Sequence, residues 1–381
     1  MPRKENRGKS FTVNTARIIV GILFIFSGLV KANDPLGLSY KMQEFFDVWS
    51  QTPSLTSLMH WLNNYALQFS LVMNTLEIVL GIALLVGWKP KLISWLLLLL
   101  IIFFTFLTGY AVLSGKIRTC GCFGDCIPLT AVQSFLKDII LCILIVILVS
   151  GYKFIHPVFN NIQSGFFIIL SLFLVLIFQS FVLKHLPVTD CLPFKKGNNI
   201  LELRKMPADA VPDKMDFIFI YSKNGRQKEF SKEKLPDSSW TFVKRQDIII
   251  QKGKNNEPPV KDFYLNTLAG QDSTESLLTQ KGEYYLLFIK DLDEHNTVWL
   301  NDFSKIVEKA KLSNRPAIII ATQAAEADNF FNVKNNFHLQ VLSCDATALK
   351  TASRTNPSLY LMNGPVVENK WGWADFQKVN K

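Results

Sequence analysis

The sequence predicts an α-helical membrane bundle followed by a soluble α/β domain, because its two halves differ in composition and pattern. Long apolar runs crowd the first half, whereas the second half alternates strand-like and helix-like segments. Residues 1–183 contain 13 Lys/Arg and 7 Asp/Glu, and residues 184–381 contain 28 and 24, as in an ordinary soluble chain. The net charge of +10 is therefore spread thinly, and no basic stripe predicts a nucleic-acid partner.

Five segments are long and apolar enough to span a bilayer, which takes roughly 20 helical residues. They are residues 15–33, 67–87, 92–113, 133–151 and 164–184. No small-residue cleavage site follows the first segment, so we expect a retained helix rather than a signal peptide. The sequence thus predicts a four-helix transmembrane domain over 1–151 and a fifth transmembrane helix within 152–186, both embedded in the lipid bilayer.

Basic residues near the short loops predict the orientation of the helices. With the N-terminus in the cytoplasm, that side carries eight Lys/Arg residues against five on the other side. This bias agrees with the positive-inside rule. An odd number of spans then places the soluble half in the periplasm of a cell whose inner membrane holds the helices. Disulfides persist in that compartment.

Two regions outside the spans have patterns of their own. The loop 34–66 places aromatic and Met side chains at helical spacing, which predicts a pair of amphipathic helices that lie on the membrane or cap the bundle. Residues 187–257 begin as a turn-rich linker and continue as a β-rich segment, with Asn224-Gly225 as a hairpin signal.

Residues 258–381 alternate strand, helix, strand, helix and strand before a final hairpin, an order that resembles the thioredoxin-like fold. Asn356-Pro357 occupies the place of the cis-proline of that family. Where thioredoxins carry Cys-x-x-Cys, this chain has DLDEHN (291–296), which lacks both a nucleophilic and a resolving thiol. We therefore expect this domain not to be an oxidoreductase by itself, and we expect Cys344, at the end of an apolar strand, to be buried and inert.

Three cysteines lie within seven residues of the loop before the fourth span, in TCGCFGDCIPLT (119–130). Zinc is disfavoured, because Cys-x-Cys spacing is short and the fourth ligand would have to be Cys191 or an aspartate, so no metal site is expected. A structural disulfide is a second interpretation. Cys126 and Cys191 both lie near predicted outer helix ends and are possible partners in such a bridge.

A redox pair is the third interpretation of this loop. A disulfide between Cys120 and Cys122 would close a very tight ring, and a strained bridge is readily reduced. Gly121 and Gly124 permit the close turn that the ring needs. No quinone, haem or flavin motif confirms an electron acceptor, so the cofactor stays unknown, with a quinone as one candidate.

Ionisable side chains within the spans are costly and call for an explanation. Glu77 lies near the middle of the second span, and Lys31 lies toward the outer end of the first. Lys31 could snorkel to the interface, or the two could form an ion pair. A proton or substrate path through Glu77 is the functional alternative. Lys137 and Asp138 open the fourth span, where we expect them at the membrane interface.

The stretch RIIVGILFIFSGLVKANDPLG, the helix of Glu77 and the CGCFGD loop resemble the DoxX-like membrane proteins, in particular the MauE (methylamine utilisation) branch, over about residues 10–150. The rest of the chain resembles DoxX family proteins from Bacteroidetes, which add a fifth span and a thioredoxin-like domain. The resemblance implies thiol or electron-transfer chemistry in the maturation of an envelope client protein. Cys120 and Cys122 match the thiol motif, whereas Cys126 and Cys191 are additions.

The sequence leaves three classes of function open. The first is thiol-disulfide or electron-transfer support at the outer face, with an envelope client or redox partner. The second is a noncatalytic membrane scaffold or assembly factor whose cysteines form structural disulfides. The third is a small-molecule transporter built around Glu77.

Overall fold

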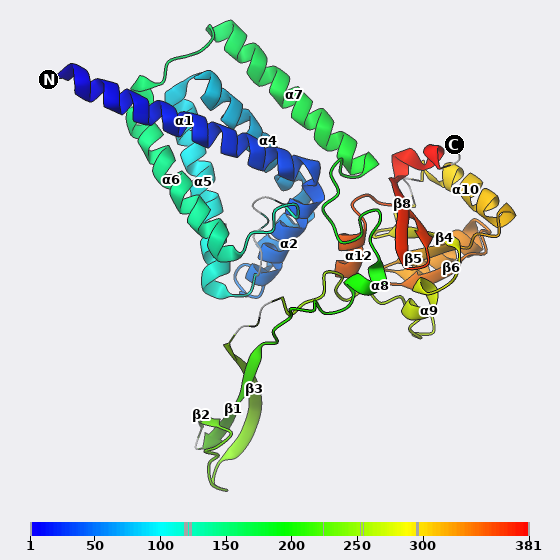
Figure 1. The fold of residues 1–381 in the computed structure, drawn as a ribbon. Helices are drawn as coiled ribbons and strands as arrows, with labels where there is room; N and C mark the ends of the chain where they lie inside the picture. Colours follow the sequence, from blue (N-terminus) through cyan, green and yellow to red (C-terminus); the bar gives the residue numbers. More distant parts are fainter. Residues whose placement is uncertain are drawn as a thin grey trace.

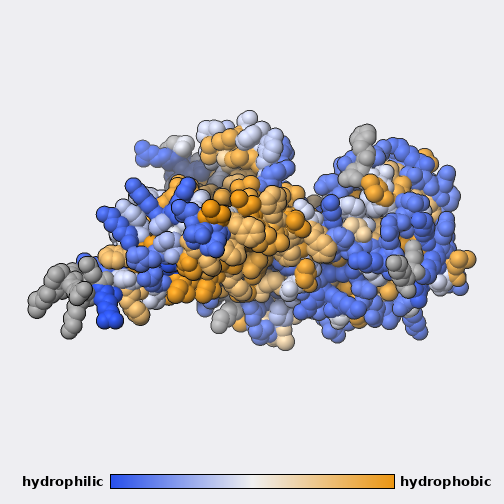
Figure 2. Space-filling model, turned by 90° about the horizontal axis from the view of Figure 1, so that it is seen from above, coloured by the Kyte–Doolittle hydropathy of each residue, from blue (hydrophilic) through white to orange (hydrophobic). Residues whose placement is uncertain are grey.

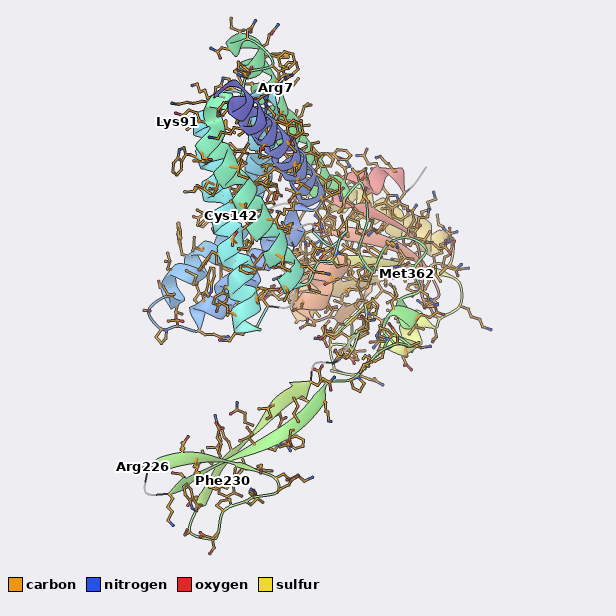
Figure 3. The ribbon with its side chains drawn as sticks, turned by 60° about the vertical axis from the view of Figure 1, so that its left-hand side comes forward. Arg7, Lys91, Cys142, Arg226, Phe230 and Met362 are labelled. Atoms are coloured by element: carbon orange, nitrogen blue, oxygen red, sulfur yellow. A yellow bond between two sulfur atoms is a disulfide. The ribbon has the colours of Figure 1, made fainter. Side chains whose placement is uncertain are left out.

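The computed structural model describes residues 2–117, 121, 124–223, 225–251, 253, 255–294 and 297–379, and it describes the side chains of all these except 2–6 and 249. A helical bundle occupies one side of the molecule, and a compact α/β domain lies against one end of it (Figure 1). A β-hairpin unit extends away from both (Figures 1 and 3).

Five helices in the described part of the chain are long and apolar enough to cross a membrane, as predicted. Thr130 and Asn160 begin two of them with capping boxes, in which Gln133 and Gln163 complete the reciprocal hydrogen bonds. The five helices are α1 (Pro2–Asn33), α4 (Ala66–Val86), α5 (Pro90–Ser114), α6 (Ala131–Gly151) and α7 (Asn161–His185). A 3-10 turn, η1 (Tyr152–Phe154), follows α6.

Glycines allow α1 and α4 to pack closely, as small residues do between membrane helices. A Cβ atom on Gly28 would lie 2.6 Å from the Ile78 side chain, and one on Gly81 would lie 2.8 Å from Ile25. This close crossing places the C-terminal half of α1 directly against the middle of α4, which carries Glu77.

The outside of the bundle presents a continuous apolar surface (Figure 2). Leu99, Ile140 and Phe173 are examples, with 72%, 59% and 59% of their surfaces exposed. An apolar belt of this kind on long helices is what lipid tails cover. The chain is therefore a multi-pass membrane protein.

The predicted helix pair in the loop 34–66 is present as α2 (Pro35–Ser50) and α3 (Thr56–Asn64). Met42 and Phe45 of α2 are buried in one cluster with Leu107 of α5. The pair therefore caps the bundle rather than lying on the membrane alone. Tyr40 and Gln43 of α2 contact the α/β domain.

The hairpin unit is a three-stranded antiparallel sheet of order β2-β1-β3, with Arg226 and Phe230 on its second strand (Figure 3). The Asn224-Gly225 hairpin signal falls between β1 and β2. The strands are β1 (Lys214–Lys223), β2 (Arg226–Ser231) and β3 (Thr241–Gln251).

The α/β domain contains a five-stranded sheet of order β6-β5-β4-β7-β8, in which β4, β5 and β6 are parallel and β7 is antiparallel to both of its neighbours, β4 and β8. The Asn356–Pro357 peptide bond before β7 is cis. The strands are β4 (Glu283–Ile289), β5 (Ala317–Ala321), β6 (Gln340–Ser343), β7 (Ser358–Asn363) and β8 (Val366–Gly372).

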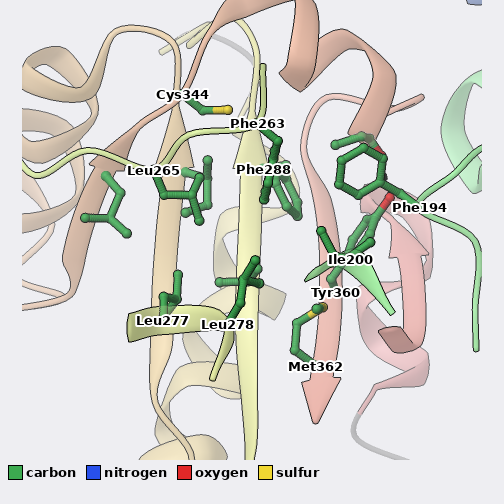
Figure 4. Close-up of a cluster of buried hydrophobic side chains, with 14 of the residues drawn as sticks. Phe194, Ile200, Phe263, Leu265, Leu277, Leu278, Phe288, Cys344, Tyr360 and Met362 are labelled. Atoms are coloured by element: carbon green, nitrogen blue, oxygen red, sulfur yellow. Dashed lines mark hydrogen bonds between the residues drawn. The ribbon is translucent and has the colours of Figure 1, made fainter. Parts of the chain in front are cut away.

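Alternate residues of β4 enter two hydrophobic clusters, one on each face of the sheet, as strand geometry requires. Phe288 packs with Phe263 and Tyr360 on one face (Figure 4), and Leu287 packs with Phe303 on the other. The first face is covered by α8 (Ile200–Leu203), α9 (Thr274–Leu278) and α12 (Ala346–Ala352). The second is covered by α10 (Leu300–Leu312), α11 (Ala324–Asp328), η2 (Asn329–Lys334) and η3 (Trp373–Lys378).

Candidate functional site

The candidate site lies where the α/β domain meets one end of the bundle, around the cysteine-bearing loop between α5 and α6. Arg354, which follows α12, donates to Asp34 and to Asp125, each at 2.7 Å, and only 6% of its side chain is exposed. Burial alone would lower the pKa of Arg354, but Asp34 and Asp125 raise it above its usual value. The arginine therefore stays charged and ties the loop to both halves of the protein.

A disulfide between Cys126 and Cys191 fixes the same loop a second time, with a Cα–Cα distance of 4.8 Å. It joins the loop to the linker that follows α7. Asn33 exchanges two hydrogen bonds with the backbone of Thr189 in that linker, at 2.8 and 3.1 Å. These contacts hold the loop and the linker together over the end of α1.

Cys120 and Cys122 lie outside the residues that the structure describes. Gly121 between them is described, with a φ of 63°, and a Cβ atom on it would lie 3.1 Å from the Lys41 side chain of α2. Gly121 therefore lies against α2, at the end of the bundle that faces the α/β domain.

Beneath this loop, Lys31 of α1 and Glu77 of α4 form a buried ion pair, with 2.5 Å between Nζ and Oε1 and side-chain exposures of 4% and 2%. The Lys31 ammonium also lies 4.5 Å from the centre of the Phe104 ring. Among the described residues, the Glu77 Oε2 atom has no hydrogen-bond partner. Lys31 therefore does not snorkel to the interface, because Glu77 holds its charge inside the bundle.

Asp138, which the sequence analysis expected at the membrane interface, is fully buried within the protein. Its carboxylate accepts a hydrogen bond from the Thr108 hydroxyl at 3.0 Å and pairs with Lys137 at 2.9 Å. Asp138 can be buried because α5 packs against α6 and supplies the Thr108 hydroxyl as a hydrogen-bond donor. Burial of the carboxylate is then compensated by polar contacts.

These two ion pairs share a cavity of about 150 Å³, whose other walls are apolar side chains such as Leu23 and Phe104. A smaller space of about 20 Å³ also borders Lys31 and Phe104, and it reaches Thr108 and Gly121. The two spaces together extend from the interior of the bundle to Gly121, with Lys31 bordering both.

Two further polar groups within the spans were missed by the sequence analysis. Gln179 of α7 accepts from Asn74 at 3.2 Å and donates to Thr75 at 3.0 Å, which ties the fifth span to α4. Arg17 of α1 donates to backbone carbonyls, including that of Leu84 at 2.9 Å. Both residues could have been identified from the sequence, because each is a polar residue within an apolar run.

The remaining described thiols are placed away from this site. Cys344 is buried at the end of β6, and burial followed by the charge of Asp345 raises the pKa of its thiol to about 12. Cys142 is a half-buried thiol that packs against the core of the bundle (Figure 3). The Cys344 thiol therefore lacks the lowered pKa that a nucleophilic cysteine needs.

The fold and the site together define a multi-pass membrane protein whose cysteine loop is clamped between a helical bundle and a soluble α/β domain. Residues 9–151 match the family described as "Methylamine utilisation protein MauE", which confirms the resemblance to MauE that was predicted for about residues 10–150. Residues 215–252, the hairpin unit, match a family described as "Domain of unknown function (DUF8463)".

A curated relative is "Protein TlpB" of Flavobacterium psychrophilum, which is 29% identical over 198 residues. The match covers 51% of this chain and 48% of that protein, so the chain spans about half the length of this relative. No solved structure matches the chain.

Proposed function

We propose that this protein carries out thiol-disulfide exchange with an envelope client at the outer face of the bacterial inner membrane, through Cys120 and Cys122. The carrying observation is the double anchoring of their loop, by the Cys126–Cys191 disulfide and by Arg354. A reactive pair needs a fixed position and nearby groups that can exchange protons, and the anchored loop together with the ion pairs around the bundle cavity supports such a role. The match of residues 9–151 to the MauE family supports the proposal.

The exchange balances without an added oxidant. The thiolate of one cysteine attacks a client disulfide, forms a mixed disulfide and releases one client thiol. The second cysteine attacks that mixed disulfide, so the client leaves with two thiols and Cys120 and Cys122 become disulfide-bonded. The reverse sequence oxidises a client dithiol instead.

The orientation belongs to the same proposal, with the N-terminus in the cytoplasm and the α/β domain in the periplasm. Arg7 and Lys91 lie at the end of the bundle away from the α/β domain, where the positive-inside rule expects basic residues (Figure 3). An extracytoplasmic position is also where the Cys126–Cys191 disulfide would persist.

The α/β domain is, in this proposal, a thioredoxin-like docking or shielding module that has lost its own thiols, and the membrane half has a DoxX-like origin. The order β6-β5-β4-β7-β8, with three parallel strands next to an antiparallel pair, supports the thioredoxin-like assignment. The residues at the end of β4, where thioredoxins carry Cys-x-x-Cys, include Asp291 and Asp293 and no cysteine.

A noncatalytic scaffold is the second candidate. The observation that favours it is the burial of Arg354 between Asp34 and Asp125, since such a clamp also suits a rigid platform. In that case the Cys126–Cys191 disulfide is purely structural, and the protein carries out no thiol-disulfide exchange.

A trapping experiment on the full-length protein in membranes separates the two. In Cys122→Ala, the remaining Cys120 cannot be released from a mixed disulfide, so exchange predicts a covalent client adduct on a non-reducing gel. Cys142→Ala, which removes a thiol inside a span, is the matched control and should give none. If neither Cys120→Ala nor Cys122→Ala traps any protein while the Cys126–Cys191 bridge stays intact, the scaffold is favoured.

A further inference from the structure

A second site lies between the two halves of the protein and involves no cysteine. A cavity of about 720 Å³ separates the α/β domain from the outer end of the bundle. The domain contributes Lys290 and Lys350 to its lining, and the bundle contributes Tyr40 of α2 and Leu67 of α4. The walls are thus polar on one side and partly apolar on the other.

The cavity lies at the edge of the sheet where ligands bind in α/β domains, outside the carboxyl ends of the parallel strands. Lys290 comes directly after β4, Thr322 directly after β5, and Lys350 lies on α12, which follows β6. Thr322 donates to the carbonyl of Lys290, and the Lys290 amide donates to Asn356 Oδ1 at 2.9 Å. The edge is therefore a fixed structure rather than a set of loose loops.

Basic side chains are concentrated in the lining of this cavity. Lys290 donates to the Tyr40 hydroxyl and Lys350 donates to the Gln43 side-chain carbonyl, each at 2.9 Å, and both acceptors are neutral. The ammonium groups lie 5.6 and 5.2 Å from the centre of the Tyr40 ring. Asp291 is one carboxylate against these two ammonium groups.

Arg354 adds to this charge without being available for a ligand. Its guanidinium lies 5.4 Å from the centre of the Tyr40 ring, but its donors are engaged by Asp34 and Asp125. Burial and then the charge of Arg354 lower the pKa of Lys290 to about 7, although Asp291 and Asp34 act in the opposite direction. A bound anion would restore the protonated form of Lys290.

We propose that this cavity binds a phosphate group through Lys290 and Lys350. Lysine binds phosphate as a compact point charge, and two lysines from different elements can contact different oxygens of one group. Leu67 and Leu183 line the cavity near the ends of α4 and α7, which are membrane-spanning helices. Apolar residues on that side favour the headgroup of an anionic phospholipid, and free phosphate is the other source of the same chemistry.

The test uses the full-length protein in two arms. In the first arm, the protein in nonionic detergent is titrated with inorganic phosphate, and the thermal unfolding midpoint is followed. In the second arm, the protein is reconstituted into phosphatidylcholine vesicles with or without phosphatidylglycerol, and retained phosphatidylglycerol is counted by native mass spectrometry. Binding in the second arm alone identifies a headgroup, and binding in the first arm alone identifies free phosphate.

Lys290→Gln and Lys350→Gln should each weaken binding at least about tenfold, since each removes a charged hydrogen bond. Lys281→Gln is the matched control, because Lys281 is exposed and lies just before β4 whereas Lys290 lies just after it. Its binding should equal that of the wild type.

Binding of neither probe, or equal binding by both variants and the wild type, would overturn the proposal. If Lys290→Gln does not fold, as judged by loss of the Cys126–Cys191 disulfide, Lys350→Gln carries the test, because Lys350 is only partly buried. The proposal does not depend on Cys120 or Cys122, so its failure would leave the thiol-disulfide exchange proposal intact.

Discussion

At the scale of single residues, the interior of the bundle is defined by charges that compensate one another. Lys31 and Glu77 were singled out in the sequence analysis because they are ionisable residues within apolar runs. Their pairing at 2.5 Å was one of the open alternatives, and it depends on the close crossing of α1 and α4. The sequence could identify both residues. It could not decide between an ion pair and a proton or substrate path, because that choice depends on which helices are neighbours.

Glu77→Gln should destabilise the protein by about 3 kcal/mol, because it leaves the buried Lys31 ammonium without its counter-charge. The double variant Lys31→Met, Glu77→Leu should be closer to the wild type, since replacing a whole buried pair by apolar residues is often neutral. Thermal unfolding in detergent measures both. Single variants as stable as the wild type would show that the pair is not formed.

Lys290 gives the phosphate site a pH dependence. The groups that face it are Tyr40, Asp34, Asp291, Lys350 and Arg354. The free site loses the Lys290 proton as the pH rises through about 7, and binding needs the proton, so affinity should fall as the pH rises. Phosphatidylglycerol binding measured at about pH 6 and about pH 8 tests this, because the lipid phosphodiester does not titrate in that range. Lys290→Gln should remove the difference between the two measurements.

At the scale of elements, apolar runs predicted the five spans well because hydropathy is a local property of the chain. The first helix begins at Pro2 rather than near residue 15, since a helix continues through polar residues that hydropathy excludes. The burial of Asp138 could not be predicted from the sequence, because its partner Thr108 lies on another helix, 30 residues away. Local sequence patterns therefore predicted the helices. The environment of particular side chains could not be predicted in the same way, because it depends on contacts between helices.

Gly28→Ala should separate α1 from α4, because a Cβ atom there would lie 2.6 Å from the Ile78 side chain. We expect a loss of about 2 kcal/mol, typical of overpacking. Gly165→Ala on α7 is the matched control, because nothing lies within 4 Å of its Cβ position. A Gly28→Ala protein that unfolds at the same temperature as the control would contradict this account of the crossing.

At the scale of the whole molecule, the two halves are joined by contacts between residues far apart in the sequence. Arg354 and Asp34 are separated by 320 positions, and Cys126 and Cys191 by 65. The disulfide was one possibility from the sequence because both cysteines lie near predicted outer helix ends. The role of Arg354 could not be predicted from the sequence. Nothing in the sequence distinguishes it from the other basic residues of the charged α/β domain, and only the fold shows that it contacts the bundle.

Arg354→Gln should loosen the α/β domain from the bundle, since it leaves the Asp34 and Asp125 carboxylates without their shared partner. The pair with Asp34 is buried, and breaking a buried pair costs about 3 to 5 kcal/mol. Hydrogen exchange should rise in the loop around Asp125 and in the first turn of α2. Arg245→Gln, which removes an exposed pair with Asp247 in the hairpin unit, should leave both segments unchanged.

The central claim is that Cys120 and Cys122 exchange electrons while Cys126 and Cys191 hold the loop. Differential alkylation and mass spectrometry of intact membranes, poised at a series of glutathione potentials, measures the state of all four cysteines together. We expect Cys120 and Cys122 to change from dithiol to disulfide within this series while the Cys126–Cys191 bridge stays oxidised. Cys120 and Cys122 that stay reduced at every potential would contradict the claim.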